Sequence, residues 1–363
     1  MRVLHIINSL DTGGAEKLLV DALPLYQKAG IEVALLTIKD SQGFFAQALL
    51  AQGIRIYSLG ANSVYHPLNI FKIIPYLSRY DIIHAHLFPA QYWVSFAKLF
   101  SLAKTTLVFT EHSTSNRRWG RKLFYIFDYL SYAQFKKIGC ITVQVKERFD
   151  HYFPRMASKT IVINNGIVLN NYMNANAYDR NRVCQQLSEN DRLLIQVSAF
   201  RSQKDQDTVI RAMRYLPSQY KLLLVGEGNR LGFCKKLVHE LELNDRVFFL
   251  GNRSDVPQLL KTAWLAVQSS HSEGFGLAAV EAMATGIPVI ATRVSGLAEV
   301  IGKDELLFEQ GDSTGLAERI LYYANHPIAY QLMIQYCTDR AKQYDIMLMV
   351  QKYGSLYKKM ITE

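Results

Sequence analysis

The sequence of 363 residues predicts an α/β protein of two domains, each built around a doubly wound parallel sheet. Two observations lead to this prediction. Short runs rich in Val, Ile and Leu alternate with amphipathic helical stretches, which is typical of parallel strands covered by helices on both faces. The alternation occurs twice, on either side of a polar, Asn-rich segment near residues 165–185. A chain of this length also suits two domains of ordinary size.

The first domain is expected at residues 1–170. Its strands are predicted at residues 2–7, 32–38, 55–59, 81–87, 105–110, 140–145 and 160–163. Its helices are predicted at residues 15–28, 44–51, 91–102 and 121–137.

The second domain is expected at residues 171–344. Its strands are predicted at residues 193–197, 221–225, 247–250, 264–268, 288–291 and 305–308. Two helices are predicted over residues 329–361, and no strand follows them. We therefore expect the last helix, about 345–363, to pack back on the first domain. In such a pair of domains, ligands are expected at the carboxyl ends of the strands, in a cleft that the two domains face.

Composition and charge narrow the function. Apolar residues make up 49% of the chain and charged residues 20%, which excludes disordered and low-complexity proteins. The net charge of +10 is concentrated in the first half, where residues 1–170 contain 19 basic and 10 acidic side chains. An anionic partner is therefore expected there: a phosphate-rich ligand, a nucleic acid or a membrane surface.

The four cysteines lie far apart, without a CxxC motif, which argues against a disulfide framework or a zinc site and favours a reduced, cytoplasmic setting. The first apolar run is short enough to be a strand, and it does not resemble a signal peptide. No run approaches the roughly 18 apolar residues of a membrane span. We expect a protein that is soluble or at most bound to a membrane surface.

The segment with the most chemical information is SEGFGLAAVEAMATGIPVIATRVSGLAEVI, residues 272–301. Gly274 and Gly276 form a turn before a predicted helix at residues 277–284, whose first N–H groups can bind a phosphate. Glu273 and Glu281 lie eight residues apart, about 12 Å at helical rise, so they can accept hydrogen bonds from both ends of a nucleotide-sugar. The alternative is an ordinary strand–turn–helix with exposed glutamates.

This segment resembles the E-x7-E signature of glycosyltransferase family 4, whose members are retaining enzymes of the GT-B fold with two Rossmann-like domains. Other features of the family occur in the expected order: GGAE at 13–16, DIIHAHLFPA at 81–90, NNGI at 164–167 and GEG at 226–228. The resemblance implies transfer of a hexosyl or N-acetylhexosaminyl group from a nucleotide-diphosphate sugar, with UDP as the default carrier. It implies a saccharide or lipid-linked saccharide as acceptor, and neither a cofactor nor a metal.

The resemblance also implies roles for individual residues. Glu281 is expected to hold the donor ribose, and Glu273 to lie near the transferred sugar. Backbone contacts to sugar and pyrophosphate are expected from Gly274, Phe275, Gly276 and Leu277. Asn165 matches the motif near the interdomain hinge, on the acceptor side. Val168 stands where the family usually has Asp, a departure from the pattern.

Arg201 and Lys204 follow a predicted strand in the second domain and are candidates to clamp a diphosphate. Cations are disfavoured at the start of a helix, so a bound anion gives a reason for their position. The family's Arg corresponds to Ala199, and Arg201 is the possible substitute. Residues 205–207 form a D-x-D sequence, which we interpret as a helix N-cap and first turn rather than a metal site.

His84 and His86 are expected on one side of a strand, because side chains alternate along strands. The alternative is a structural role for both. His86 is closer to the carboxyl end, and the resemblance implies that the second His of this run lies at the reaction centre. His112 ends the next strand and is a weaker candidate for the same site.

Several strand ends carry further candidates. Gly13 and Gly14 form a strand–glycine–helix junction, where Gly14 N–H can reach a phosphate or the acceptor; a tight turn is the simpler interpretation. Gly226 ends another strand, beside the expected nucleotide pocket. In GNRSDV at 251–256, we expect Arg253 to be the most exposed group and to contact the base.

Four cations precede an aromatic helical stretch: Arg117, Arg118, Arg121 and Lys122. Cations beside interfacial aromatics suggest a patch for an anionic membrane surface or a lipid phosphate. A solvated loop is the alternative, and no nucleic-acid-binding motif accompanies the patch. The resulting expectation is a cytoplasmic protein, with a peripheral position at the inner face of the membrane as the alternative to a fully soluble one.

Two other functions remain open. A nucleotide-sugar epimerase on the same fold would act on the donor alone. A non-catalytic module would bind a nucleotide-sugar or a membrane and leave the sugar intact.

Overall fold

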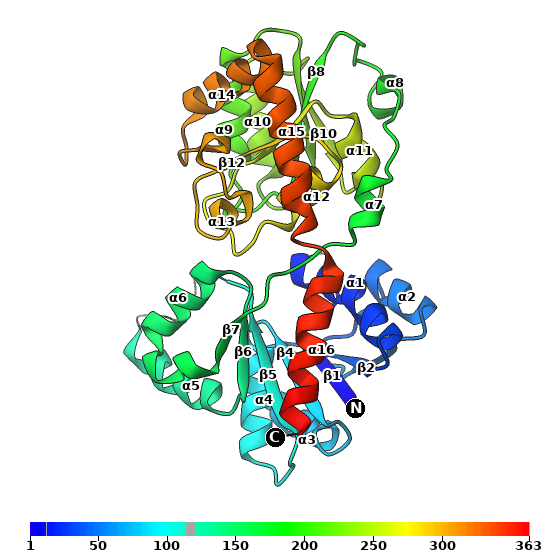
Figure 1. Cartoon of the computed structure of the whole chain (residues 1–363), viewed down its shortest axis with the longest axis vertical. Helices are drawn as coiled ribbons and strands as arrows, with labels where there is room; N and C mark the ends of the chain where they lie inside the picture. Colours follow the sequence, from blue (N-terminus) through cyan, green and yellow to red (C-terminus); the bar gives the residue numbers. More distant parts are fainter. Residues whose placement is uncertain (12, 114–118, 120, 363) are drawn as a thin grey trace. The chain divides into compact units, whose positions relative to one another are not determined.

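The structure is a computed structural model that describes residues 1–11, 13–113, 119 and 121–362. It contains two compact units (Figure 1). The first unit consists of Met1–Gly166 and the C-terminal helix α16 (Ile346–Thr362), and the second of Ile167–Asp345. The boundary expected at residue 170 falls inside helix α7 (Leu169–Met173).

The first unit contains a parallel sheet of seven strands in the order β3-β2-β1-β4-β5-β6-β7. The strands are β1 (Arg2–Ile7), β2 (Glu32–Thr37), β3 (Arg55–Ser58), β4 (Ile82–His86), β5 (Thr106–Glu111), β6 (Lys137–Cys140) and β7 (Thr160–Val162). The order reverses at β1 and β4, as in doubly wound sheets, so the predicted fold class is confirmed for this unit.

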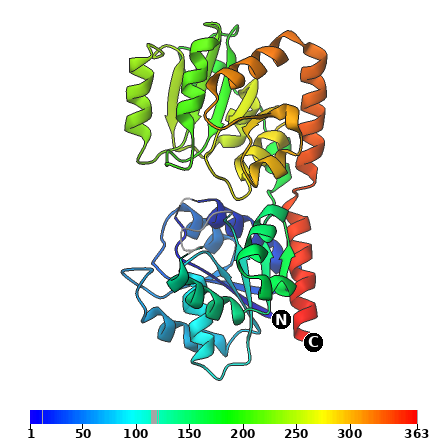
Figure 2. The same ribbon diagram turned by 90° about the vertical axis from the view of Figure 1, so that its left-hand side faces the viewer.

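Helices cover both faces of this sheet. They are α1 (Gly14–Lys28), α2 (Phe44–Ala51), α3 (Asn69–Leu77), α4 (Ala90–Leu99), α5 (Lys122–Ala133), α6 (Val143–Tyr152) and α16. Helix α1 packs on α2 and α16, while α4 packs on α3 and α5. Figure 1 shows α16 (red) lying over the strands, and Figure 2 shows the same helix from the side.

One predicted strand, residues 140–145, is wrong. The strand β6 ends at Cys140, and helix α6 begins at Val143. The β-branched run ITVQV favours a strand by composition, but Thr142 caps the helix by accepting a hydrogen bond from Val145 N at 3.1 Å. Helices α3 and α6 were also not expected from the sequence.

The second unit contains a parallel sheet of six strands in the order β10-β9-β8-β11-β12-β13, again doubly wound. The strands are β8 (Arg192–Val197), β9 (Tyr220–Val225), β10 (Val247–Gly251), β11 (Leu265–Gln268), β12 (Val289–Thr292) and β13 (Leu307–Phe308). Its main helices are α7, α8 (Arg180–Val183), α9 (Gln206–Ala212), α10 (Leu231–Glu240), α11 (Val256–Thr262), α12 (Leu277–Ala284), α13 (Leu297–Ile301), α14 (Ser313–Asn325) and α15 (Pro327–Lys342). Helix α12 has the predicted bounds.

Within the described part of the chain, no helix combines the length and the apolar character that crossing a bilayer requires.

Candidate functional site

Two loops at the carboxyl ends of neighbouring strands in the second unit are joined by backbone contacts. The loop after β8 and the loop after β11 form a bridge between Lys204 and Ser270. Two hydrogen bonds flank this bridge, from Asp205 N to Ser269 O at 3.3 Å and from His271 N to Gln203 O at 2.8 Å. Residues about 70 positions apart in the sequence are therefore held side by side.

Lys204 and Glu273 meet at this junction as an ion pair. Their side chains are 22% and 17% exposed, so both charges are partly withdrawn from water yet open to a ligand. Ser270 Oγ lies 3.4 Å from the Glu273 carboxylate. The pair gives a site that can rearrange around an anion, because Lys204 can exchange a carboxylate for a phosphate oxygen.

Glu281, the second carboxylate of the E-x7-E segment, lies in helix α12 and is only 7% exposed. The N-cap of this helix is Gly276, in a left-handed conformation (φ 95°) and without a side chain that could cap the first turn. An exposed pair of glutamates, the alternative considered from the sequence, is therefore not what the structure contains.

Gly296 was not singled out from the sequence, yet it shapes the loop that carries Glu273. Its φ is +78°, and a Cβ atom there would lie 2.5 Å from the carbonyl oxygens of Glu273 and Gly274. Only glycine allows this close approach. The signal available in the sequence was a glycine at a strand–helix junction, between β12 and α13.

Two buried polar side chains that the sequence analysis does not predict hold the loops after β8 and β11. Gln206 Nε2 donates to Ser198 Oγ at 3.0 Å and to Ala199 O at 3.1 Å. Gln196 Nε2 donates to Ser269 O at 3.1 Å. Arg201 is exposed to solvent, and its backbone N donates to Ala199 O at 2.9 Å.

The interpretation of residues 205–207 as a helix N-cap is confirmed. The Asp205 carboxylate accepts hydrogen bonds from Thr208 N at 3.3 Å and from Thr208 Oγ1 at 2.7 Å. Asp207 pairs with Arg230 at 2.8 Å. Each carboxylate therefore has a structural partner within the unit.

The remaining candidates of the second unit lie at the ends of β9 and β10. Gly226 has φ +132°, and a Cβ there would collide with the carbonyl oxygen of Ser198, so the two loops touch through backbone. The expectation that Arg253 is the most exposed group of its loop is wrong. Its guanidinium donates to both oxygens of Asp255, at 2.8 and 2.6 Å, and it is half-buried while Asn252 and Ser254 are exposed. This pairing lowers the pKa of Asp255 to about 2.

In the first unit, His84 and His86 project to the same side of β4, as predicted, with ring centroids 4.2 Å apart. His84 has partners at both nitrogens: Tyr357 Oη lies 2.5 Å from Nδ1 and Thr110 Oγ1 lies 2.7 Å from Nε2. Tyr357 belongs to α16, so this histidine joins the C-terminal helix to the sheet.

His86 also has two ring partners, His5 at 3.0 Å and His112 at 3.3 Å. Burial lowers the pKa of all four histidines, to about 3 for His5 and about 4 for His112. The rings are therefore neutral at physiological pH. Ring nitrogens of His5, His84 and His86 lie within 4.8 Å of one another.

The other acceptor-side candidates are more scattered. Asn165 lines a small cavity together with His86 and His112. Gly13 is the N-cap of α1, and its carbonyl accepts from Lys17 N at 3.0 Å; Gly14 is the first residue of that helix.

Three of the four cations of the predicted patch lie wholly or partly outside the described residues: Arg117, Arg118 and the side chain of Lys122. Arg121 is described, and it is the exposed N-cap residue of α5.

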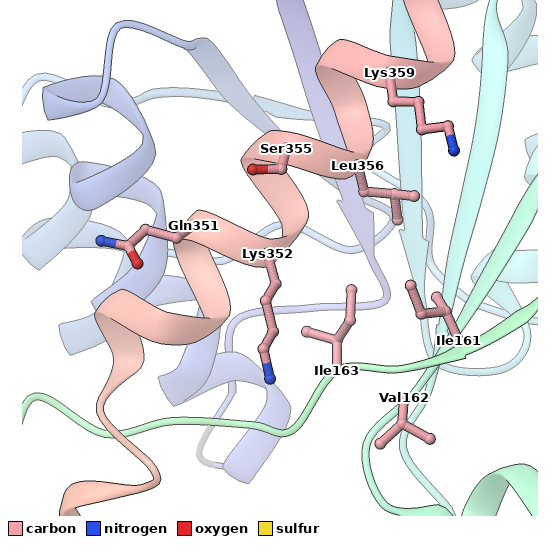
Figure 3. A pocket seen from close by; sticks show the side chains of 8 residues that line it. All are labelled: Ile161, Val162, Ile163, Gln351, Lys352, Ser355, Leu356 and Lys359. Atoms are coloured by element: carbon pink, nitrogen blue, oxygen red, sulfur yellow. The ribbon is translucent and has the colours of Figure 1, made fainter.

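A groove of about 510 Å³ lies elsewhere in the first unit, between β7 and α16. Its lining residues are Ile161, Val162, Ile163, Gln351, Lys352, Ser355, Leu356 and Lys359 (Figure 3). None of the predicted site residues belongs to it.

Comparisons with known proteins agree with this arrangement. The family model described as Glycosyltransferase Family 4 matches residues 12–171, and the model described as Glycosyl transferases group 1 matches residues 178–340. The chain is 41% identical to N-acetyl-alpha-D-glucosaminyl L-malate synthase of Bacillus anthracis over 139 residues, which cover 37% of this chain and 36% of that protein. It is 25% identical to the putative glycosyltransferase EpsF of Bacillus subtilis, over 80% of this chain and 78% of that protein.

Solved structures show the same fold. HepE of Anabaena, in complex with UDP and glucose, superposes with a TM-score of 0.86 at 24% identity over 99% of both chains. Sucrose-phosphate synthase of Thermosynechococcus elongatus superposes with a TM-score of 0.77 at 21% identity, also over 99% of both chains. Together with the two parallel sheets, these likenesses identify the fold as GT-B.

Proposed function

The chain belongs to glycosyltransferase family 4, and on that premise we propose that it transfers a sugar from a nucleotide-diphosphate sugar to an acceptor saccharide. The observation that carries the proposal is the meeting of Lys204 and Glu273 at two joined strand ends, next to the helix that holds Glu281. A cation and two carboxylates so arranged suit a ligand that contains a diphosphate between two hydroxyl-bearing rings.

In this proposal the second unit binds the donor. Lys204, assisted by the exposed Arg201, neutralises the diphosphate, and Glu281 accepts hydrogen bonds from the ribose. Glu273 and the backbone of residues 274–277 contact the transferred sugar. A uridine nucleotide is proposed as the carrier, because HepE, which shares the fold, is described in complexes with UDP and UDP-glucose.

The transferred group is proposed to be a hexosyl or N-acetylhexosaminyl residue, and the acceptor a saccharide or a lipid-linked saccharide. The first unit is assigned the acceptor side, with Gly13, His112 and Asn165 as its site residues. The reaction is proposed to retain the configuration of the sugar, with the departing phosphate taking the proton of the acceptor hydroxyl. Lys204 and the backbone N–H groups at the start of α12 would stabilise the leaving phosphate without a metal.

A peripheral position at the inner face of the membrane is part of the proposal. Helix α5 supports it, because its side chains Tyr125, Ile126, Phe127 and Leu130 are exposed although all are apolar or aromatic. The only acidic side chain of this helix, Asp128, is buried against Tyr92. Cosedimentation with vesicles that contain anionic lipid, and not with neutral vesicles, is the expected result; no sedimentation with either would remove this part.

The proposal is tested by product analysis with a panel of UDP-sugars, with and without saccharide acceptors. Transfer predicts release of UDP and a lengthened acceptor only when both substrates are present. Conversion of the donor alone, to another sugar nucleotide or to free nucleotide, would favour the epimerase. A donor that binds and stays intact with every acceptor would favour the non-catalytic module.

Glu273→Gln is the informative variant for this assay. It keeps the size of the side chain but removes its charge, so we expect lower turnover with unimpaired binding of free UDP. Glu240→Gln, at an exposed helix position whose carboxylate pairs with Lys236, is the matched control and should behave as wild type.

A further inference from the structure

Three histidines from three neighbouring strands form a hydrogen-bonded row in the first unit. His5 lies in β1, His86 ends β4, and His112 follows β5 directly. His5 Nδ1 lies 3.0 Å from His86 Nε2, and His86 Nδ1 lies 3.3 Å from His112 Nε2. Both nitrogens of His86 are therefore occupied by other imidazoles.

The two ends of this row differ. His5 is 1% exposed, and its outer nitrogen, Nε2, is buried without a hydrogen-bond partner among the described residues. The space enclosed beside it is about 10 Å³, at the lower limit of what a single water molecule needs. His112 is partly exposed, and within the described chain its outer nitrogen, Nδ1, has no protein partner.

The protons of the row can be arranged in only two consistent ways. Each neutral imidazole has one N–H and one lone pair, so each contact requires one donor and one acceptor. Either every ring is protonated at Nδ1 and donates outward, or every ring is protonated at Nε2 and donates inward. The second arrangement places the N–H of His5 in the core without an acceptor.

In folded proteins a buried N–H without an acceptor is rarer than a buried acceptor that is left under-satisfied. We therefore propose that the row is directed outward: His5 donates to His86, His86 donates to His112, and His112 presents Nδ1–H at the open end. In this assignment His112 is the residue that contacts the ligand, and His5 and His86 are positioning residues. The assignment adds detail to the proposed function. The choice of ligand for His112 rests on that function.

The ligand that suits this end is an oxygen with a free lone pair, such as a sugar hydroxyl or a phosphate oxygen. His112 would serve it as a fixed neutral donor. Because burial lowers the pKa of this imidazole to about 4, the donor stays neutral at pH values where a solvated histidine would titrate.

Nuclear magnetic resonance of the intact protein with ¹⁵N-labelled histidine tests the assignment without any substrate. Long-range ring correlations distinguish the two tautomers, and His5→Phe, His86→Phe and His112→Phe assign the signals. We expect all three rings to be neutral and protonated at Nδ1 between pH 6 and 8. Protonation at Nε2 in all three, or an imidazolium among them, would overturn the proposal.

Kinetics of sugar transfer from UDP-glucose, or from whichever UDP-sugar proves active, test the positioning role. Asn has an amide N–H where His5 has Nδ1–H, so His5→Asn can still donate to His86, whereas His5→Phe cannot. We expect His5→Phe to lower kcat about tenfold with an unchanged KM for the donor, and His5→Asn to retain most of the wild-type kcat. Equal kcat in the two variants would contradict the positioning role.

The same preparation settles the competing interpretation, a metal held by His5, His84 and His86. The proposal predicts no stoichiometric metal in the purified protein and no change of the ring signals on addition of Zn²⁺. One equivalent of tightly bound metal that is lost in His5→Phe would overturn it. Because the spectroscopic test needs no turnover, failure of this proposal and failure of the proposed function are distinguishable.

Discussion

Lys204 and Glu273, which are 69 residues apart in the sequence, form an ion pair where the loops after β8 and β11 join. The contact places the predicted diphosphate cation against the predicted sugar carboxylate. The two charges of this pair neutralise each other. We expect a bound diphosphate to share or take over the N–H donors of Lys204 that now serve the carboxylate.

Replacing Lys204 by Ala should weaken binding of UDP by about 1.5–3 kcal/mol, the range for a hydrogen bond to a charged group. Isothermal titration calorimetry measures the difference. Lys236→Ala, which removes a lysine whose side chain is 77% exposed, is the control and should bind as wild type. Equal affinities of wild type and Lys204→Ala would remove Lys204 from the site.

Gly296→Ala should disturb the loop of Glu273, because the added Cβ would press on two carbonyl oxygens of that loop. Gly311→Ala is a matched control, since Gly311 has a similar positive φ of +79° but open space around it. We expect about 1–2 kcal/mol of destabilisation from the positive φ in Gly311→Ala, and at least as much in Gly296→Ala, because the ψ of Gly296, −55°, lies outside the left-handed helical region. The collision should lower the free energy of unfolding of Gly296→Ala by roughly a further 1–3 kcal/mol. This variant should also bind UDP more weakly than wild type. If the two variants lost equal stability and Gly296→Ala bound UDP as wild type does, the close contact of Gly296 with the Glu273 loop would be unimportant.

The sequence was sufficient for the parallel sheets, the bounds of α12 and the placing of Glu281 on that helix, because apolar periodicity and glycine positions report local structure. It was insufficient where a side chain makes a tertiary contact. Thr142 converts a β-branched run into a helix start, and Asp255 withdraws Arg253 from solvent.

Contacts between loops distant in sequence could not be predicted for the same reason. The pairing of Lys204 with Glu273 depends on the strand order that makes β8 and β11 neighbours. The row of histidines depends on the adjacency of β1, β4 and β5, which brings His5 beside a motif 81 residues away. No local pattern contains either relationship.

Tyr357→Phe should destabilise the first unit. The substitution removes the hydroxyl that lies 2.5 Å from His84 Nδ1 and leaves that buried nitrogen without its partner. We expect a loss of about 1–3 kcal/mol in the free energy of unfolding, measured by urea denaturation. Tyr215→Phe, at a half-exposed position, should change stability by less than about 0.5 kcal/mol. A loss no larger than that of the control would contradict a stabilising contact between Tyr357 of α16 and His84 of β4.

Stability should fall as the pH is lowered below about 6.5. The pKa of His5 is lowered to about 3 by burial, whereas in the unfolded chain the same ring takes up a proton near pH 6.5. The unfolded state therefore binds more protons between these values, and the contribution of His5 is complete above pH 6.5 and lost below it. In this interval, each such histidine should lower the free energy of unfolding by about 1.4 kcal/mol for each unit by which the pH falls.

Denaturation at pH 7.5, 6 and 5 checks this expectation. The loss of stability with falling pH should be less steep in His5→Phe than in wild type, because one titrating group is gone. Parallel curves for the two proteins would contradict a neutral, buried His5.

The central claim, that the second unit binds a nucleotide-diphosphate sugar through Glu281 and Lys204, is tested most directly by thermal stabilisation. Wild type and Glu281→Ala are heated side by side with a panel of nucleotide-diphosphate sugars. The account predicts that one donor raises the Tm of wild type and that the shift is lost in the variant, which would also identify base and sugar. No shift of wild type with any donor, or an equal shift in Glu281→Ala, would contradict it.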